Sequence, residues 1–255
     1  MLLIDTHCHL YSEEFLPDID AVIERGTHEG VQKFYLPGID STSINAMLNL
    51  EECFPNKCFA MMGLHPCYVK ENYKQELDIV QQWLAKRKFA AVGEIGLDFY
   101  WDKTFATEQY EAFRIQMEWA IAYNNPIVIH TRNAMQETIN LVKEYVPKGI
   151  RGIFHCFSGS YESAQEIINA GFYLGIGGVL TYKNAGLAEV LQKIDLKHLV
   201  LETDAPYLTP VPFRGKRNES SYLKYVVTKL AEAKGVSVEE VAAITTANAE
   251  KIFGI

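Results

Sequence analysis

Hydrophobic residues gather in short runs along the chain, and longer amphipathic segments separate these runs. The short runs are apolar at nearly every position, which is typical of strands buried on both faces in a parallel sheet. We expect such strands at Leu2–Thr6, Lys33–Pro37, Cys58–Leu64, Ala90–Gly93, Ile127–His130, Gly152–His155, Tyr173–Ile176 and Leu199–Leu201.

The segments between these strands have apolar positions three or four residues apart, which is the spacing of one helix face. In the segment Thr107–Tyr123 this face consists of Tyr110, Phe113, Met117 and Ala120. The stretch Val238–Phe253 has the pattern of a last helix, which we expect to close an outer ring of helices.

Eight strand–helix units within 255 residues indicate an α/β fold, namely a single-domain (β/α)8 TIM barrel spanning residues 1–255. Strand counting leaves an open, doubly wound sheet as the alternative. The sequence contains no internal repeat, low-complexity segment or linker, and this favours one domain.

The composition limits the function more than the fold. Hydrophobic residues make up 48% of the chain and charged residues 22%, values typical of a soluble globular protein. The 32 acidic and 24 basic side chains give a formal net charge of −8. This balance argues against a protein that coats nucleic acid nonspecifically, but not against a nucleic-acid enzyme whose positive charge comes from metal ions.

Neither a targeting segment nor a disulfide framework is evident. The start, Met1–Asp5, has no basic residue before its apolar run, and no stretch approaches the ~18 apolar residues of a membrane helix. The five cysteines are an odd number without CxxC spacing. We therefore expect a cytoplasmic protein with no membrane contact and no obligate protein partner.

Histidines and carboxylates recur where the expected strands end. Side chains two residues apart on a strand point the same way, so His7 and His9 form a pair. If the barrel is correct, all of these strand ends meet at its C-terminal mouth, where barrel enzymes place their chemistry. Five of the seven histidines and two acids share this position: His7, His9, His65, His130, His155, Glu94 and Asp204.

Taken singly, these residues have simpler interpretations. A lone histidine after an apolar strand is most often a hydrogen-bonded core residue, and Asp5 and Asp98 can be helix caps or turn formers. The coincidence of four histidines and two carboxylates at the ends of five strands favours divalent metals instead.

Six ligands are too many for one tetrahedral ion with an open position, but they suit two ions that share a carboxylate. We assign His7, His9 and Asp204 to one metal ion and His130 and His155 to the other, with Glu94 bridging both. A two-metal site is the arrangement used in phosphate-ester hydrolysis. Such a site gives an acidic protein a local positive centre that attracts phosphate.

With these residues in place, the sequence resembles the TatD family of metal-dependent deoxyribonucleases, within the larger superfamily of metal-dependent hydrolase barrels. The matching segments, in chain order, are DTHCHL, GLHP, VGEIGLDFY, PIVIHTRNA, FHCFSGS, LETDAPYLTP and RGKRNE. They span nearly the whole chain. The resemblance implies a (β/α)8 barrel that hydrolyses DNA phosphodiester bonds with divalent metal ions.

The resemblance also implies roles for single residues. It makes His7, His9, Glu94 and Asp204 ligands of the first metal, and Glu94, His130 and His155 ligands of the second. Asp204 would also orient or deprotonate the attacking water. His65 matches a family histidine near the reacting phosphate, and Glu202 is expected either to assist Asp204 or to form a structural salt bridge.

Two features separate this chain from related patterns. Family members usually continue Asn-Glu with Pro, where this chain has Asn218-Glu219-Ser220, and this change affects no expected ligand. Related amidohydrolases often bridge their metals with a modified lysine. Glu94 stands at that place here, which points away from the hydrolysis of ring amides.

Basic and small residues near the strand ends are candidate substrate contacts. We expect Arg132 to reach a phosphate bidentately and Ser158-Gly159, at the start of a helix, to bind phosphate through backbone N–H groups. Arg214, Lys216 and Arg217 place three cations in the loop after Asp204. For each of these residues a solvated rim position is the alternative. Exposed members of the aromatic set Phe99, Tyr100, Trp101, Phe157 and Tyr207 would stack on unpaired bases, whereas packing within the fold is the alternative for most of the set.

The function we expect is metal-dependent hydrolysis of DNA, by a 3'-5' exonuclease that acts on single strands or ends. The alternatives are a hydrolase of other phosphoesters or amides on the same dinuclear site, and a non-catalytic metal-binding protein. Mg²⁺, Mn²⁺ and Zn²⁺ all suit mixed histidine and carboxylate ligands.

Overall fold

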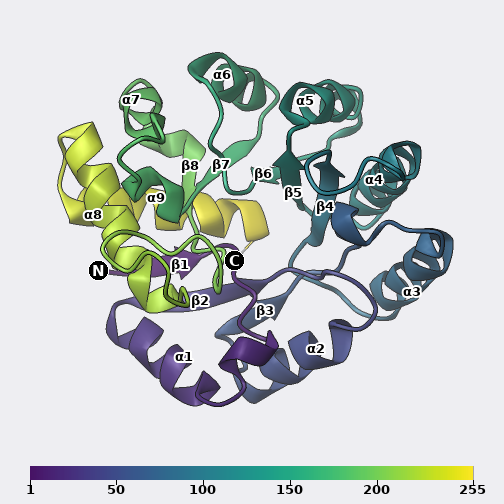
Figure 1. Ribbon diagram of the computed structural model, residues 1–255, viewed down its shortest axis with the longest axis horizontal. Coiled ribbons are helices and arrows are strands. Elements are labelled where there is room, and N and C mark those ends of the chain that lie inside the picture. The colour runs from purple at the N-terminus through teal and green to yellow at the C-terminus, as the bar shows by residue number, and fades with distance from the viewer. Residues whose placement is uncertain (255) are drawn as a thin grey trace.

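Parallel strands form the inner ring of the molecule, and helices surround them in chain order (Figure 1). The computed structural model describes residues 1–254. The strands are β1 (Leu3–Asp5), β2 (Val31–Leu36), β3 (Cys58–Ala60), β4 (Val92–Asp98), β5 (Ile127–Arg132), β6 (Gly152–Phe154), β7 (Tyr173–Ile176) and β8 (Leu199–Leu201).

Helices follow the strands and cover their outer side. They are α1 (Ile19–His28), α2 (Ile44–Cys53), α3 (Tyr73–Lys86), α4 (Ala106–Ala122), α5 (Met135–Lys143), α6 (Tyr161–Asn169), α7 (Leu187–Gln192), α8 (Leu223–Lys234) and α9 (Val238–Phe253). The predicted face of α4 is confirmed, because Phe113, Met117 and Ala120 are buried. None of the helices within residues 1–254 is long and apolar enough to cross a membrane.

Two ladders make up the ring, β1-β2-β3 and β4-β5-β6-β7-β8, and backbone hydrogen bonds join them at both seams. At one seam the N–H of Thr6 donates to the carbonyl of Leu201 at 3.0 Å. At the other the N–H of Gly93 donates to the carbonyl of Met62 at 3.0 Å. This ring of bonds is that of a TIM barrel rather than of an open sheet, so the predicted fold class is confirmed.

Strand β4 is longer than predicted. We expected it to end at Gly93, but it runs on to Asp98, and all of its residues are buried. The reason is its pairing with β5, which continues to the pair Asp98–Arg132. Glu94 therefore lies within a strand instead of after one.

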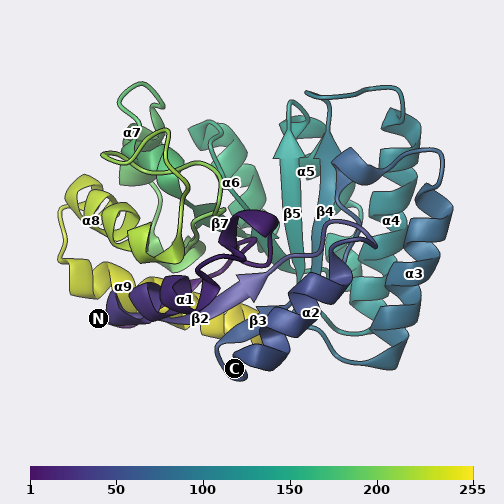
Figure 2. The ribbon, with the colours of Figure 1, turned by 60° about the horizontal axis from the view of Figure 1, so that its bottom comes forward.

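The last helix has the predicted bounds, but it does not lie where we expected it. Ala249, Ile252 and Phe253 of α9 pack against one residue from each of several strands, including Ile4, Val128 and Val200. The ring of Phe253 stacks on Tyr35 with centroids 3.7 Å apart. Thus α9 covers the N-terminal end of the barrel, opposite the long loops, instead of joining the outer ring (Figure 2). This leaves the C-terminal mouth free for chemistry.

Candidate metal centre

On three strands the inner wall of the barrel changes from apolar to polar between one inward side chain and the next. Side chains two residues apart on a strand point the same way. Three apolar residues of the lower layer are therefore followed, two positions on, by polar residues at the mouth: Val128 by His130, Ile153 by His155 and Val200 by Glu202. The two-residue period along these strands thus places polar side chains at the mouth of the barrel.

A first cluster of ligand-type atoms comes from His7, His9, Glu94 and Asp204. Nε2 of His7 lies 3.3 Å from Nε2 of His9, 3.2 Å from Oε2 of Glu94 and 3.6 Å from Oδ1 of Asp204. Nε2 of His9 lies 3.7 Å from Oε2 of Glu94 and 3.5 Å from Oδ1 of Asp204. Donor atoms about 2.0–2.1 Å from a tetrahedral zinc ion stand about 3.3 Å apart, so one divalent cation fits among these atoms.

A second cluster faces the other oxygen of Glu94. Oε1 lies 3.0 Å from Nδ1 of His130, 2.8 Å from Nε2 of His155 and 3.4 Å from Nε2 of His65. The two oxygens of one carboxylate, of which only 2% is exposed, thus face different sets of histidines. This is the geometry of a carboxylate that bridges two ligand sets.

The charges in this cluster explain the direction of its pKa shifts. Burial raises the pKa of Glu94, but the surrounding histidines, led by His155, hold it well below its usual range. Burial lowers the pKa of His155 and of His130, yet neighbouring carboxylates outweigh this effect and raise both above the usual value. Protons on these rings balance the buried carboxylates, and a divalent cation would supply the same positive charge and displace them.

The ligand-type histidines are held by groups on the far side of their rings. Nδ1 of His9 lies 3.0 Å from the hydroxyl of Tyr11, which itself donates to the carbonyl of Pro37. Nε2 of His130 lies 2.8 Å from Oδ2 of Asp98. Such partners fix the tautomer and the orientation of metal-binding imidazoles.

His155 also has a carboxylate behind its ring, that of Glu202, although no hydrogen bond joins the two side chains. Its Nδ1 lies 3.4 Å from Oε1 of Glu202, and the same oxygen accepts the N–H of Cys156. Glu202 has no exposed surface. A Cβ on Gly175 of β7 would stand 2.1 Å from the other carboxylate oxygen, so the glycine makes room for this buried acid.

His65 differs from the other site histidines in its hydrogen bond. Its Nδ1 accepts the N–H of Cys67 at 3.1 Å. Burial lowers the pKa of His65, which favours the neutral ring. A neutral imidazole that accepts at Nδ1 carries its proton on Nε2. Nε2, which faces Glu94, is therefore a hydrogen-bond donor in the metal-free chain, and it lies within one cluster of ligand-type atoms with Glu94 and His130.

Asp204 lies at the seam between β8 and β1. Its N–H donates to the carbonyl of His7 at 2.9 Å, and 14% of its side chain is exposed. Burial raises its pKa, but the hydrogen bond with His9 and nearby histidines lower it below the usual value. Asp204 is therefore an ionised carboxylate with access to solvent.

The buried Asp5 fixes this seam. Its Oδ1 accepts the N–H of Thr203 at 3.0 Å, and its Oδ2 accepts the hydroxyls of Thr203 and Ser220, each at 2.6 Å. Asp5, the last residue of β1, thus ties the segment that leads to His7 to the segment that carries Asp204. Ser220 supplies one of these bonds.

The four predicted substrate contacts differ in their exposure and in their partners. Arg132, Ser158 and Arg214 are exposed. Arg217 instead pairs with Asp18 through two contacts of 2.8 and 2.9 Å. Ser158 lies before the helix and does not begin it, because α6 starts at Tyr161 and Ser160 caps it by accepting the N–H of Ser163. The expectation that Ser158-Gly159 starts the helix is therefore wrong.

The chain matches known proteins along nearly its whole length. The sequence profile of the family described as TatD related DNase matches residues 4–254. The chain belongs to the TatD family. It is therefore a metal-dependent hydrolase, and the histidine and carboxylate clusters at the mouth of the barrel are its candidate metal-binding groups.

Relatives in the TatD family match along their whole length. The chain is 41% identical over 255 residues to the uncharacterized metal-dependent hydrolase YabD of Bacillus subtilis, covering 100% of both chains. It is 33% identical to the 3'-5' ssDNA/RNA exonuclease TatD of Citrobacter rodentium, covering 99% of this chain and 98% of that protein. The crystal structure of YJJV, a TatD homolog from Escherichia coli K12, matches with a TM-score of 0.93 and 30% identity, covering 99% of this chain and 98% of that one.

Two groups in this TatD-family site were not predicted in their present roles. Tyr11 supports His9 from the turn that follows it, and its position two residues after His9 could have revealed it. Asp98 was interpreted as a cap or turn former. It does form a turn, because Oδ1 accepts the N–H groups of Tyr100 and Trp101, but its other oxygen contacts His130.

Proposed function

We propose that the chain hydrolyses phosphodiester bonds in single-stranded nucleic acid, from the 3' end. The observation that carries this proposal is the position of Glu94, whose two oxygens face separate sets of histidines. Two-metal sites of this kind suit the in-line displacement at phosphorus. The name of the Citrobacter rodentium relative supports the choice of substrate and direction.

The cofactors we propose are two divalent cations. His7, His9, Asp204 and Glu94 would hold one of them, and Glu94, His130 and His155 would hold the other. When bound, such cations neutralise charge on the phosphate and lower the pKa of water. The mixed nitrogen and oxygen donor set suits Zn²⁺ and Mn²⁺ and admits Mg²⁺.

Asp204 and His65 are placed to move the protons of the reaction. We assign to Asp204 the role of orienting the attacking water and accepting its proton, because it is ionised and partly exposed. The water oxygen then forms a bond to phosphorus while the bond to the leaving oxygen breaks, and the leaving oxygen takes up a proton from Nε2–H of His65 or from solvent. We assign to Nε2–H of His65 a hydrogen bond to the phosphate or to the leaving oxygen, since its tautomer makes Nε2 a donor.

Glu202 and the exposed arginines have supporting roles in this proposal. Glu202 would act through His155, which it contacts, because the carboxylate is buried away from solvent. Arg132 and Arg214 would bind phosphates, and the exposed backbone around Ser158 offers further donors. Arg217 is held by Asp18 and would serve the fold first.

The test is a cleavage assay with DNA labelled at the 5' or the 3' end, single-stranded or duplex, in Mg²⁺, Mn²⁺ and Zn²⁺. We expect stepwise shortening of single strands from the 3' end, and its loss in Glu94→Ala and Asp204→Ala. Glu232→Gln, a change on the exposed surface of α8, is the matched control. A panel of small phosphodiesters and cyclic amides completes the assay. Turnover of these without cleavage of nucleic acid would overturn the proposed substrate while keeping the metal site.

A further inference from the structure

Two adjacent aromatic side chains stand open at the mouth of the barrel. Tyr100 is 50% exposed and Trp101 is 69% exposed, in the loop that follows β4. Their rings meet edge to face with centroids 4.8 Å apart. Exposed aromatic side chains of this size are costly to keep in water and often mark a binding surface.

The loop that carries these rings is anchored at both ends. At its start Oδ1 of Asp98 accepts the N–H groups of Tyr100 and Trp101, at 2.9 and 3.2 Å. At its end Asp102 pairs with Lys70 at 2.9 Å and accepts the N–H of Thr104 at 2.8 Å.

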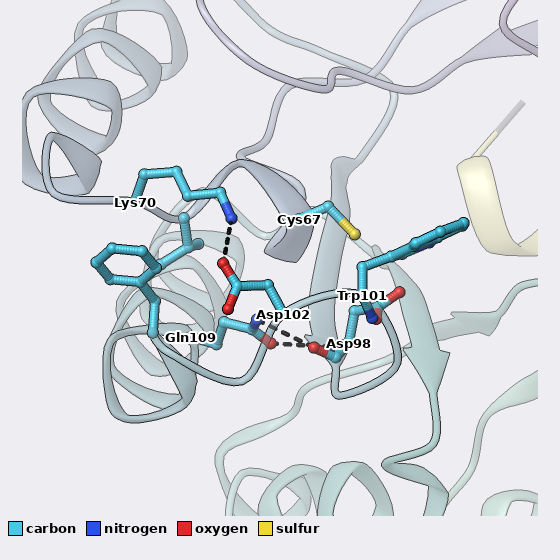
Figure 3. Close-up of a pocket in the computed structure, with 8 residues that line it drawn as sticks. Cys67, Lys70, Asp98, Trp101, Asp102 and Gln109 are labelled. Carbon is cyan, nitrogen blue, oxygen red and sulfur yellow. Dashed lines mark hydrogen bonds and ion pairs between the residues drawn. The ribbon is translucent and has the colours of Figure 1, made fainter.

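Figure 3 shows this packing around a cavity of about 20 Å³, with the ring of Trp101 directed away from the Lys70–Asp102 pair. A cavity of that size holds about one water molecule. The loop is therefore closely packed beneath the aromatic rings. The backbone that carries the rings is held in place, which reduces the entropy lost when a ligand orders this loop.

Arg132 lies over the same rings. Its guanidinium carbon is 3.8 Å from the ring centre of Tyr100 and 5.2 Å from that of Trp101. Four other arginines pair with carboxylates: Arg25, Arg87, Arg114 and Arg217. Within residues 1–254 Arg132 has no such partner, so its N–H donors are available to an anion.

This group of side chains is joined directly to the candidate metal centre. Arg132 lies two residues beyond His130 on β5, about 6.6 Å along the strand. Asp98 links the two in a second way, since one of its oxygens holds the aromatic turn and the other contacts His130. A ligand on the rings is thus next to the site where the bond is cleaved.

We infer that Tyr100, Trp101 and Arg132 form a subsite for one unpaired nucleobase and its phosphate. The base would stack on the exposed face of Trp101, and the guanidinium of Arg132 would bind the adjacent phosphate. The inference rests on the proposed function and adds the reason for single-strand preference. In a duplex each base is stacked within the helix, and its faces are not available to a protein ring.

The experiment measures binding by fluorescence anisotropy in EDTA, so that cleavage does not contribute. The probes are a short oligothymidylate and an abasic oligomer of the same length. Stacking on an aromatic side chain contributes enough that Trp101→Ala should weaken oligothymidylate binding by about 5- to 150-fold. Abasic binding should not change, and Trp101→Phe should restore most of the affinity. Arg132→Ala should weaken the binding of both probes.

The matched control is Tyr123→Ala, which removes an aromatic ring of 42% exposure at the other end of α4. Turnover of a small phosphodiester with metal present checks the catalytic centre in every variant and should stay unchanged in Trp101→Ala. Equal affinity of Trp101→Ala and the unsubstituted chain for oligothymidylate, or an equal loss for both probes, overturns the subsite but not the proposed function. If the unsubstituted chain turns over the small diester but neither binds nor cleaves nucleic acid, the proposed function fails and the subsite with it.

Discussion

Asp98 accepts a hydrogen bond from His130, with Oδ2 2.8 Å from Nε2, and this contact turns Nδ1 of the same ring toward Glu94. A carboxylate behind an imidazole fixes its tautomer and raises its basicity as a ligand. In Asp98→Asn the amide can keep its oxygen on the turn and place its NH₂ group toward His130. Nε2 must then accept, which moves the ring proton to the nitrogen that faces the candidate metal position.

We therefore expect Asp98→Asn to lower the affinity for the second metal ion by about 10- to 100-fold, with little change in the melting temperature of the metal-free chain. Isothermal titration with Mn²⁺ and Zn²⁺ measures this. Asp102→Asn, on the same loop but without contact to a histidine, should bind metal as the unsubstituted chain does. Unaltered metal affinity in Asp98→Asn would show that Asp98 serves only the turn.

Metal binding should release protons and weaken as the pH falls. His130 and His155 have raised pKa values in the metal-free chain, and both rings must be deprotonated to bind a metal. Titration in buffers of different ionisation enthalpy, at about pH 6 and about pH 8, counts the released protons and gives the affinity at each pH. Equal affinity at both values would mean that these rings do not ligate the metal.

The order of hydrophobic runs was enough to predict the barrel, because each buried strand and each amphipathic helix carries its own periodicity. The place of α9 was not predictable in this way. Its apolar positions show that one face is buried, but not whether that face meets the outer wall or the end of the barrel. That choice depends on the inward residues at the base of the strands, Ile4 and Val200 among them.

The ligand-type residues were predictable for a similar reason, since polar residues that end apolar runs are conspicuous. Their supports were not, because they depend on register between strands. The pairing of Asp98 with Arg132 sets how far β4 and β5 run beside each other, and hence which aspartate reaches His130. The ion pair between Arg217 and Asp18 likewise joins segments that lie far apart in the sequence.

Arg132 and Arg217 should differ in what their loss affects. Arg132 has no carboxylate partner among the described side chains, so Arg132→Ala should raise KM for single-stranded DNA and leave the melting temperature unchanged. Arg217 is held by Asp18 and stacks over Phe15, so Arg217→Ala should lower the melting temperature instead. Steady-state kinetics beside thermal unfolding separates the two effects. The reverse result would move the substrate contact to Arg217.

Acid stability should depend on Asp18. The hydrogen bond from Arg217 lowers the pKa of Asp18 to about 2. A carboxyl group whose pKa is lower in the folded state stabilises the fold above its unfolded pKa, near 3.8, and that contribution is lost as the pH falls toward 2. The pair is partly exposed, so the contribution is about 0.2–1 kcal/mol. Asp18→Asn should be less stable near neutral pH and equal to the unsubstituted chain near pH 2 in urea unfolding curves.

Ser220 should stabilise the ionised form of Asp5, because its hydroxyl donates to Oδ2 at 2.6 Å. Burial raises the pKa of Asp5 to about 6, and the bonds from Ser220 and Thr203 limit that rise. Since this pKa exceeds its ordinary value of 3.8, the folded chain binds more protons than the unfolded one between these values. The contribution of Asp5 to stability therefore falls as the pH rises from about 4 to about 6.

Ser220→Ala removes one donor and should raise the pKa of Asp5 further, which extends this loss to higher pH. The variant should be about 1–3 kcal/mol less stable at neutral pH and closer to the unsubstituted chain near pH 4. Urea unfolding of the metal-free chain across this pH range measures the difference. Ser163→Ala on α6, whose hydroxyl contacts only Ser160 among the described residues, should leave the curve unchanged. A pH-independent loss of stability in Ser220→Ala would mean that the serine contributes packing, and that Asp5 does not depend on it for its charge.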